Sequence, residues 1–271
     1  MVGIPDAVRL QATHPFRELP APPGFQKVWE EPFFACLHPL PMAQLVEPLE
    51  LGPDDVESAV GSARALVRGH GRSLLIWMVG SDQAWLGPRL EELGLVNEDT
   101  PGFESVENAM ALLEAPAGAA AKGVTVAEVD SFESFAASQR VQAEAFGFTP
   151  AMRDEMDAEL PKRYEEYTTP GSPMRQFNAL VGGHVVGTAA AVLGSAAVNL
   201  FGGSVIASAR GGGVYRALMQ ARWDLAVALG TPALTVQAGR MSRPIAERLG
   251  FQLIEPMSVF VDDFSGTPAD T

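Results

Sequence analysis

The stretch from Phe177 to Ala209 contains no Asp, Glu, Lys or Arg, and it constrains the fold more than any other part of the chain. As a helix it would be long enough to cross a bilayer. Dipeptides that favour turns interrupt it at Gly182-Gly183, Gly194-Ser195 and Gly202-Gly203. The pieces between them have the lengths of strands: 177–181, 184–193 and 196–201. We therefore predict the buried strands of a meander sheet, with a membrane anchor as the alternative.

Composition limits the classes of protein to which the chain can belong. Its 271 residues are 47% hydrophobic, which is enough for a buried core in one large domain or two small ones. With 33 acidic against 19 basic residues the net charge is −14, which argues against nonspecific binding of nucleic acid and favours an amine-bearing partner. Cys36 is the single cysteine, which excludes an internal disulfide, a cysteine-cluster zinc site and an iron–sulfur cluster.

Residues 1–24 do not resemble a signal peptide, because no apolar core lies between a basic start and a small-residue cleavage site. The prolines at the end of this segment, from Pro20 to Pro23, predict a surface arm that leads into the first packed element. A cytoplasmic location is therefore expected.

Small residues near the middle of the chain predict a division into two halves. The sequence APAGAAAK, from Ala115 to Lys122, has the composition of a flexible linker. We expect an N-terminal arm at 1–24, a first domain at 25–115, a linker at 116–122 and a second domain at 123–271. The elements expected in the second domain are a strand at 123–129, helices at 131–146 and 150–167, the three strands above, a helix at 214–229, a strand at 232–238, a helix from about 242 to 250 and a strand at 251–264.

The first half repeats part of this order. It predicts strands near 33–37 and 44–51, a helix at 53–68, a strand at 73–79, a helix ending at Leu93 and a strand at 103–113. Local sequence matches accompany the order: Pro88–Leu95 with Pro244–Phe251, and Ala63–Val67 with Tyr215–Met219. Internal duplication is the preferred interpretation. Common features of helix sequences are the alternative.

The chemistry of the chain is carried by Arg210-Gly211-Gly212-Gly213-Val214-Tyr215, between an apolar strand and an amphipathic helix. Consecutive glycines let backbone N–H groups converge on an anion at a helix N-terminus, as in pyrophosphate binding. An ordinary glycine-rich turn is the alternative. A dinucleotide fingerprint is excluded because Arg216 and Leu218 stand where it needs glycine, and no Gly-Lys-Ser/Thr of a P-loop is present.

The sequence around this loop resembles the acyl-CoA-binding core of the GNAT acetyltransferase superfamily. That core has a loop of the form Arg/Gln-x-x-Gly-x-Gly/Ala, which Arg210 and Gly213 match, whereas Tyr215 replaces the final small residue. The later segment VQAGRMSRPIAERLGF ends in the Leu-Gly-Phe that is common in the family. The resemblance extends from about Val124 to Phe264. It implies an α/β (α+β) GNAT fold, with a mixed central sheet flanked by helices, as a partial N-terminal copy followed by a complete C-terminal copy.

The resemblance also implies where acetyl-CoA binds as a co-substrate. Strand 197–207 would be the splayed central strand that receives the pantetheine arm. The residues implied in cofactor binding are Gly203, Ser204, Val205, Arg210, Gly211, Gly212, Gly213, Val214, Tyr215 and Arg216, although a solvated role for Arg216 is equally consistent. The matching loop of the first half carries Asp54, Asp55 and Glu57, so we predict that it binds no CoA and has a structural role.

The resemblance implies direct attack of an amine on the thioester, but the tyrosine that often protonates the leaving thiolate is replaced by Ala246. Tyr215 is expected beside the pyrophosphate, away from the thioester. Two residues are catalytic candidates: Glu144, whose alternative role is a solvated helix face, and Ser242, whose alternative role is a helix N-cap. The four histidines show no metal-ligand spacing, so no metal is expected.

The sequence therefore predicts an acetyl-CoA-dependent N-acetyltransferase for an amine of a small molecule or protein. Acidic residues of the helix at 150–167 would attract such an amine, with a solvated helix face as the alternative. A noncatalytic acyl-CoA-binding or sensing module is the alternative function, because Ala246 cannot transfer a proton and the central strand has no carboxylate. Neither nucleic acid nor a membrane is an expected partner, and assembly as a homodimer is allowed.

Overall fold

The structure is a computed structural model that describes residues 3–38, 42–99, 103–118 and 121–266. The chain forms two compact units. Unit 1 comprises residues 1–23, 111–236 and 245–252, and unit 2 comprises 24–110, 237–244 and 253–271. Each unit is described below by itself.

The sheet of unit 1 contains the charge-free stretch. Its strand order is β10-β9-β8-β7-β6, with these bounds: β6 (Val124–Glu128), β7 (Met174–Val181), β8 (His184–Leu193), β9 (Val198–Val205) and β10 (Leu234–Ala238). Strands β6 to β9 are antiparallel neighbours, whereas β10 runs parallel to β9. The meander predicted for 177–209 is thus confirmed, and no helix in the described part of the chain is long and apolar enough to cross a membrane.

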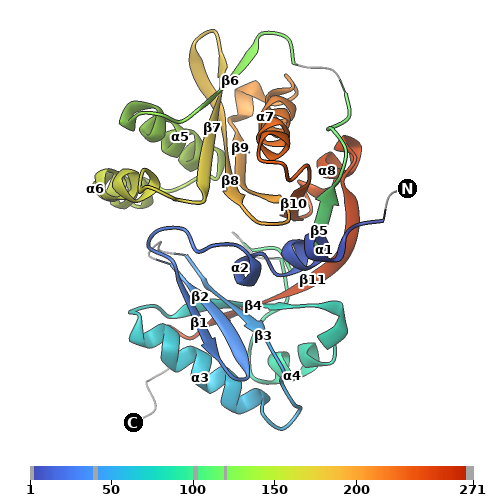
Figure 1. Cartoon of the computed structure of the whole chain (residues 1–271). Coiled ribbons are helices and arrows are strands. Elements are labelled where there is room, and N and C mark those ends of the chain that lie inside the picture. Colours follow the sequence, from blue (N-terminus) through green and yellow to red (C-terminus); the bar gives the residue numbers. More distant parts are fainter. Residues whose placement is uncertain (1–2, 39–41, 100–102, 119–120, 267–271) are drawn as a thin grey trace. The chain divides into compact units, whose positions relative to one another are not determined.

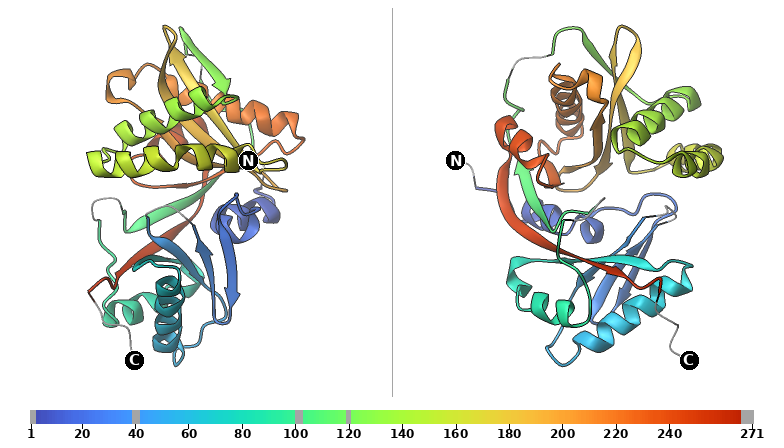
Figure 2. Two further views of the ribbon diagram at one scale, coloured as in Figure 1. Left: turned by 90° about the vertical axis from the view of Figure 1, so that its left-hand side faces the viewer. Right: turned by 180° about the vertical axis from the view of Figure 1, so that it is seen from behind.

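Two layers of helix cover this sheet. Figure 1 shows α5 (Phe132–Ala145) and α6 (Pro150–Tyr167) on one face of β7–β9 and α7 (Val214–Ala228) on the other, and the view from behind in Figure 2 agrees. The Ser131 side chain accepts from Ser134 N in a capping box, as the sequence predicts. Pro150 occupies the first turn of α6. Backbone N–H groups in a first turn have no partner within the helix, so proline, which lacks an N–H, loses no hydrogen bond there.

The N-terminal segment, predicted as an arm, contains two helices before the exposed Pro20. It forms α1 (Asp6–Thr13) and α2 (Pro15–Glu18) within unit 1. Buried Gln11 donates to Ala197 O at 3.0 Å and to Thr235 Oγ1 at 3.1 Å, and its own Oε1 accepts from Ala197 N at 3.3 Å. These bonds fix α1 at the start of β9 and β10.

Unit 2 is built on strands in the order β1-β2-β3-β4-β11-β5. Their bounds are β1 (Gln26–Glu30), β2 (Phe33–Leu37), β3 (Gln44–Pro48), β4 (Leu74–Val79), β5 (Val106–Leu112) and β11 (Gln252–Asp263). The helical segments α3 (Val56–Gly69), η1 (Ser81–Gln83) and α4 (Leu86–Glu92) follow β3 and β4. Buried side chains of α3 and α4 pack with Trp77 and Phe260 in the core of this unit. Strand β1 was not expected from the sequence.

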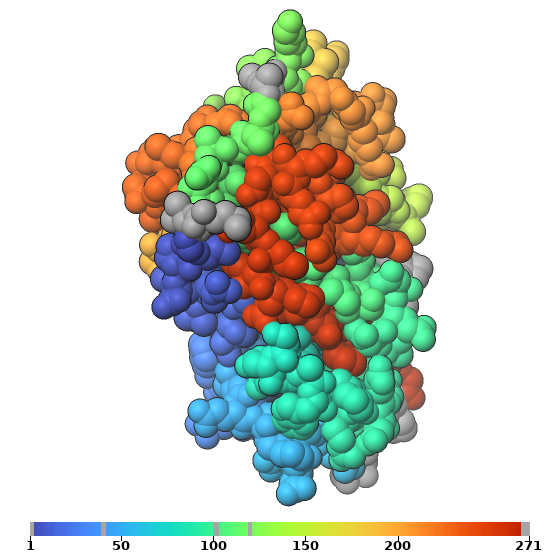
Figure 3. Space-filling view, turned by 90° about the vertical axis from the view of Figure 1, so that its right-hand side faces the viewer, coloured from blue at the N-terminus to red at the C-terminus, as the bar shows by residue number. Residues whose placement is uncertain are grey.

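Because of the pairing of β11, the two units differ from the two domains that the sequence predicts. The sequence assigns residues 123–271 to one domain, whereas β11 pairs antiparallel with β4 of the first half, from Ser258–Val79 to Asp263–Leu74. Figure 3 shows this C-terminal segment in red against teal residues of the first half, where Val96 and Val261 also form a bridge. The boundary therefore follows strand pairing and not the linker, and α8 (Arg243–Leu249) begins in unit 2 and continues in unit 1.

The element order supports internal duplication. In the first half, three antiparallel strands are followed by helix α3, the parallel strand β4, helix α4 and strand β5. In the second half, β7, β8 and β9 are followed by α7, the parallel strand β10, α8 and β11. Each half also has a pair of helices before the three strands, α1–α2 and α5–α6.

Candidate functional site

Strand β9 is irregular where the sequence places part of the cofactor site. Thr188 pairs with Ser204 and Ala190 pairs with Phe201, so β9 has one residue more than β8 over this interval. The extra residue forms a β-bulge, and Gly202 adopts φ +54°, a conformation that glycine reaches without strain. Pairing of β9 with β10 extends only from Val198 to Asn199. After Asn199, β9 is therefore no longer paired with β10 along the edge that the two strands share at their start.

The glycine loop follows β9 along the chain. After the short helix η2 (Ala207–Ala209), Gly211 and Gly213 adopt φ values of +79° and +80°, and Gly213 caps the N-terminus of α7. A Cβ atom on Gly213 would lie 2.8 Å from the Cβ of Ala121. The loop is exposed from Arg210 to Gly212. Gly211 and Gly212 are thus exposed just before a 15-residue helix, where free backbone N–H groups and the helix dipole favour an anion.

The other residues of the predicted cofactor set differ in their burial and in their contacts within the protein. Arg210 Nε donates to Val205 O at 3.1 Å, so that carbonyl already has a partner. Ser204 is buried, and its Oγ has no hydrogen-bond partner among the described residues. Exposed Arg216 approaches the linker, because a Cβ on Gly118 would lie 3.1 Å from its guanidinium carbon. Val214 is buried in the first turn of α7, next to Gly187.

The Tyr215 side chain lies against the bulge of β9. A Cβ on Gly203 would be 3.1 Å from Tyr215 Cε2, so the ring fills the space that a side chain at 203 would need. Tyr215 also interacts with Arg222, a buried residue of α7 whose pKa is lowered by burial and partly restored by this tyrosine. Sequence reasoning did not identify Arg222, because nothing in its helical spacing distinguishes it from a surface arginine.

Neither catalytic candidate forms a hydrogen bond with a described residue of the predicted cofactor set. Glu144 is exposed on α5, and its carboxylate makes no hydrogen bond with the described residues. Ser242 Oγ donates to Gly239 O at 3.3 Å, in a turn that belongs to unit 2. Ala246, at the position where the resemblance implies a tyrosine, is a buried residue of α8. The roles of both candidates stay predictions.

The corresponding loop of the first half has a different electrostatic character. A Cβ on Gly52 would lie 2.9 Å from Asp55 Oδ2, so the Asp55 carboxylate folds back over the entry to α3. A carboxylate close to a helix N-terminus repels a phosphate group there. This supports the prediction that the first-half loop has no role in CoA binding.

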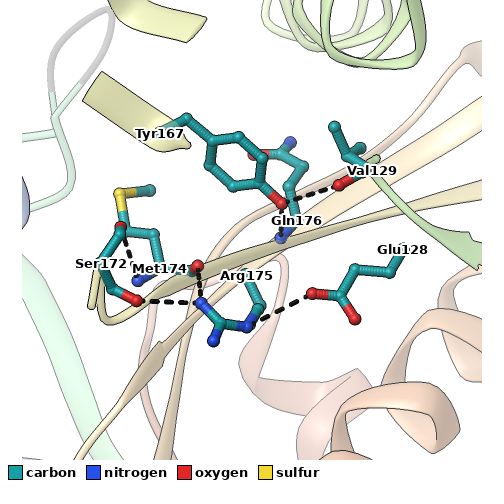
Figure 4. Close-up of polar contacts among 7 residues, drawn as sticks. All are labelled: Glu128, Val129, Tyr167, Ser172, Met174, Arg175 and Gln176. Carbon is teal, nitrogen blue, oxygen red and sulfur yellow. Dashed lines mark hydrogen bonds and ion pairs between the residues drawn. The ribbon is translucent and has the colours of Figure 1, made fainter. Parts of the chain in front are cut away.

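A shallow polar pocket of about 280 Å³ lies at the β6–β7 edge of unit 1. Figure 4 shows that its polar groups largely satisfy one another. Arg175 bonds to Ser172 O at 2.9 Å and Met174 O at 2.7 Å and forms an ion pair with Glu128 at 3.3 Å. Tyr167 donates to Val129 O at 3.1 Å and accepts from Gln176 N at 3.3 Å, and burial raises the pKa of its hydroxyl. These contacts fix the end of α6 to the sheet, and the pocket contains none of the predicted site residues.

No cluster of three or more histidine, cysteine or carboxylate side chains in the described ranges could hold a metal ion. Comparison with protein-family models gave no match, and comparison with curated protein sequences gave none either.

Comparison with solved structures gave matches over almost the entire chain. One is a GCN5-related N-acetyltransferase from Kribbella flavida, with a TM-score of 0.68 and 18% identity over 96% of both chains. Another is a tandem GNAT protein from the clavulanic acid biosynthesis pathway, with a TM-score of 0.57 and 17% identity over 98% of this chain and 90% of that one. A third is a GCN5-related N-acetyltransferase from Sphaerobacter thermophilus, with a TM-score of 0.56 and 16% identity over 86% and 76%.

Proposed function

This chain has the GNAT fold, and from that premise we propose that it is an acetyl-CoA-dependent N-acetyltransferase that acetylates an amine of a small molecule or protein. The observation that carries the proposal is the glycine loop Gly211–Gly213 at the start of α7, in which Gly211 and Gly212 are exposed. It follows η2 and the bulged strand β9, which pairs with β10 only at Val198 and Asn199. Backbone amides and the helix dipole supply the positive potential for a pyrophosphate. An acidic protein can therefore bind an anionic co-substrate.

Bound acetyl-CoA would supply an activated thioester, and the chain would supply position and electrostatics. Gly203 is exposed at the bulge, and with no side chain it allows a bound group to approach the backbone of β9. The residues we propose for binding are those predicted from the sequence: Gly203, Ser204, Val205, Arg210, Gly211, Gly212, Gly213, Val214, Tyr215 and Arg216. Holding an amine close to a polarised carbonyl accounts for much of the rate of such a transfer.

The acidic residues of α6 favour a protonated amine as the acceptor. Asp154, Glu155 and Asp157 are exposed on this helix, and the α5–α6 pair covers the sheet face opposite α7 (Figure 1). Their negative potential would raise the local concentration of a cation. The amine would attack the thioester carbon directly, with no covalent intermediate on the enzyme.

The test replaces a glycine of the loop. Gly213→Ala places a methyl group against Ala121 and strains a positive-φ position, so we expect at least a tenfold loss of acetyl-CoA affinity by calorimetry. Gly230→Ala is the matched control, because Gly230 has φ +76° at the other end of α7 and no atom near its Cβ position. Equal acetyl-CoA affinity in the wild type and both variants would contradict the loop as the binding site.

The second candidate function is a noncatalytic acyl-CoA-binding module. It is favoured by buried Ala246, which stands where a proton donor is expected, and by the absence of a carboxylate on β9. A panel of primary amines separates the two functions. Release of free CoA thiol supports the enzyme, whereas stabilisation by acetyl-CoA without thiol release supports the binding module.

A further inference from the structure

Helix α6 carries an apolar stripe that is covered along only part of its length. Its members recur every four residues and so share one face of the helix: Met152, Met156, Leu160 and Tyr164. The later part of this face is packed against α5, because Leu160 is buried in a cluster with Phe135 and the Tyr164 ring lies 5.6 Å from the Phe135 ring. The earlier part is open: residues 150–155 are exposed, and the Met152 side chain is 37% exposed.

Two phenylalanines lie in the connection that leads from α5 to this open part. The rings of Phe146 and Phe148 are stacked with centroids 6.2 Å apart, and Phe146 is 54% exposed. Hydrogen bonds fix the connection, since Phe148 N donates to Ala143 O at 2.9 Å and Arg153 Nε of α6 donates to Phe148 O at 3.0 Å. We name these side chains the apolar patch: Phe146, Phe148, Met152 and Met156. Stacked aromatic rings beside flexible methionines suit apolar ligands of varied shape.

The charges around the apolar patch favour a cationic ligand. The carboxylates of Glu144, Asp154 and Glu155 are exposed in the last turn of α5 and the first turns of α6. The cation among them, Arg153, donates to the Phe148 carbonyl. An ammonium group carried on an apolar body therefore matches both the potential and the surface at this place.

The apolar patch begins close to the strand that the proposed function assigns to the co-substrate. The amide nitrogen Nε2 of Gln142 on α5 is 3.0 Å from the position of a Cβ on Gly202, at the bulge of β9. Phe146 follows Gln142 by one helical turn, about 6 Å along the axis of α5, and its N donates to Gln142 O at 3.0 Å. An acceptor whose body lies on the patch can therefore extend its amine towards β9.

We propose that the apolar patch binds the body of the acceptor, so that the substrates are primary amines on an alkyl or aryl group; this inference rests on the proposed function. The exposed carboxylates attract the ammonium end, and the patch selects the apolar end. Electrostatics alone would favour polyamines, which carry further positive charge. The patch thus separates two classes of amine.

The test measures the CoA thiol that the full chain releases from acetyl-CoA with butylamine, octylamine and 1,8-diaminooctane. Burial of one methylene group favours binding up to about fourfold, so kcat/KM should be at least about tenfold higher for octylamine than for butylamine. The diamine has the same alkyl chain as octylamine but ends in a second ammonium group. That charge would have to lie on the apolar patch, so its kcat/KM should be close to that of butylamine.

A pair of exposed phenylalanines on α5 supplies the variant and its control. Phe146→Ser removes the exposed ring of the patch and should reduce the octylamine-to-butylamine ratio of kcat/KM to about 1. Phe132→Ser is the matched control, because Phe132 is 44% exposed at the opposite end of α5. This control should keep the ratio of the wild type.

Equal kcat/KM for butylamine and octylamine, or an octylamine preference that survives Phe146→Ser, would overturn the inference while the proposed function stands. A dimer in light scattering that Phe146→Ser dissociates would overturn it too, because a second copy would then cover the patch. Absence of thiol release with every amine of the panel would instead remove the proposed enzymatic function together with the inference.

Discussion

At the scale of single residues, one arginine position has taken different roles in the two halves. The sequence match of α3 with α7 aligns Arg64 with Arg216. Arg64 holds Asp262 of β11 through two bonds of 2.8 Å each and also donates to Leu93 O at 3.3 Å. Arg216 lies exposed beside the linker at Gly118. The same helix position thus fixes a strand in one half and lies at the surface beside the linker in the other.

The Arg64–Asp262 pair predicts a large loss of stability when one partner is removed. Asp262 is only 2% exposed. Removal of one partner of a buried ion pair leaves the other charge unpaired, which lowers the free energy of unfolding by about 3–5 kcal/mol. Chemical denaturation of Asp262→Asn should show this loss for unit 2. Glu92→Gln removes the exposed Arg89–Glu92 pair and should change the free energy of unfolding by less than about 1 kcal/mol. Equal effects would contradict the burial argument.

Glu107 of β5 predicts how stability depends on pH. Burial, and then the neighbouring Glu104, raise the pKa of its carboxyl to about 7. Because the pKa is higher in the folded state than in the unfolded chain, the stabilisation is fully present below pH ~4.5 and is lost as the pH rises through ~7. Glu107→Gln should therefore reduce the fall in Tm between pH 5 and pH 8. Glu98→Gln, at an exposed carboxylate of the same unit, should leave that fall unchanged.

At the scale of elements, predictions succeed where local chemistry is strong. Ser131 caps α5, Pro150 starts α6 and Gly213 starts α7, and each of these signals needs only its own neighbours in sequence. Gly182-Gly183 and Gly194-Ser195 likewise separate β7, β8 and β9 correctly, whereas Gly202-Gly203, predicted as a break, lies inside β9 at its bulge.

Elements were missed where the local pattern was weak or where distant partners determine burial. Strand β1 has the burial pattern exposed–partial–partial–exposed–exposed, so it shows no apolar alternation. Helix α1 ends at Thr13, two residues before Pro15, and its burial depends on Gln11 reaching the start of β9. The Tyr215–Gly203 contact is also long-range: the loop could be predicted from its glycines, but the direction of the tyrosine could not.

At the scale of the whole molecule, β11 makes the first-half unit depend on the end of the chain. Phe260 of β11 is buried in the core of unit 2, where its ring approaches Gly87. Phe260→Ala should destabilise unit 2 by about 3–5 kcal/mol. Hydrogen exchange should accelerate in β2 and β4.

Leu253→Ala is the control on the same strand, because Leu253 is 42% exposed and should have little effect. Unchanged protection of β2 and β4 in Phe260→Ala would contradict the assignment of β11 to this unit.

The pairing of β11 with β4 also has a consequence for synthesis. A ribosome adds about 5–20 residues per second, and β4 ends at Val79 whereas its partner begins only at Gln252. For many seconds the nascent chain presents β4 with one edge open, in a sheet whose core still lacks Phe260. The first half of this protein is made first, but it completes its fold only when the last strand has left the ribosome.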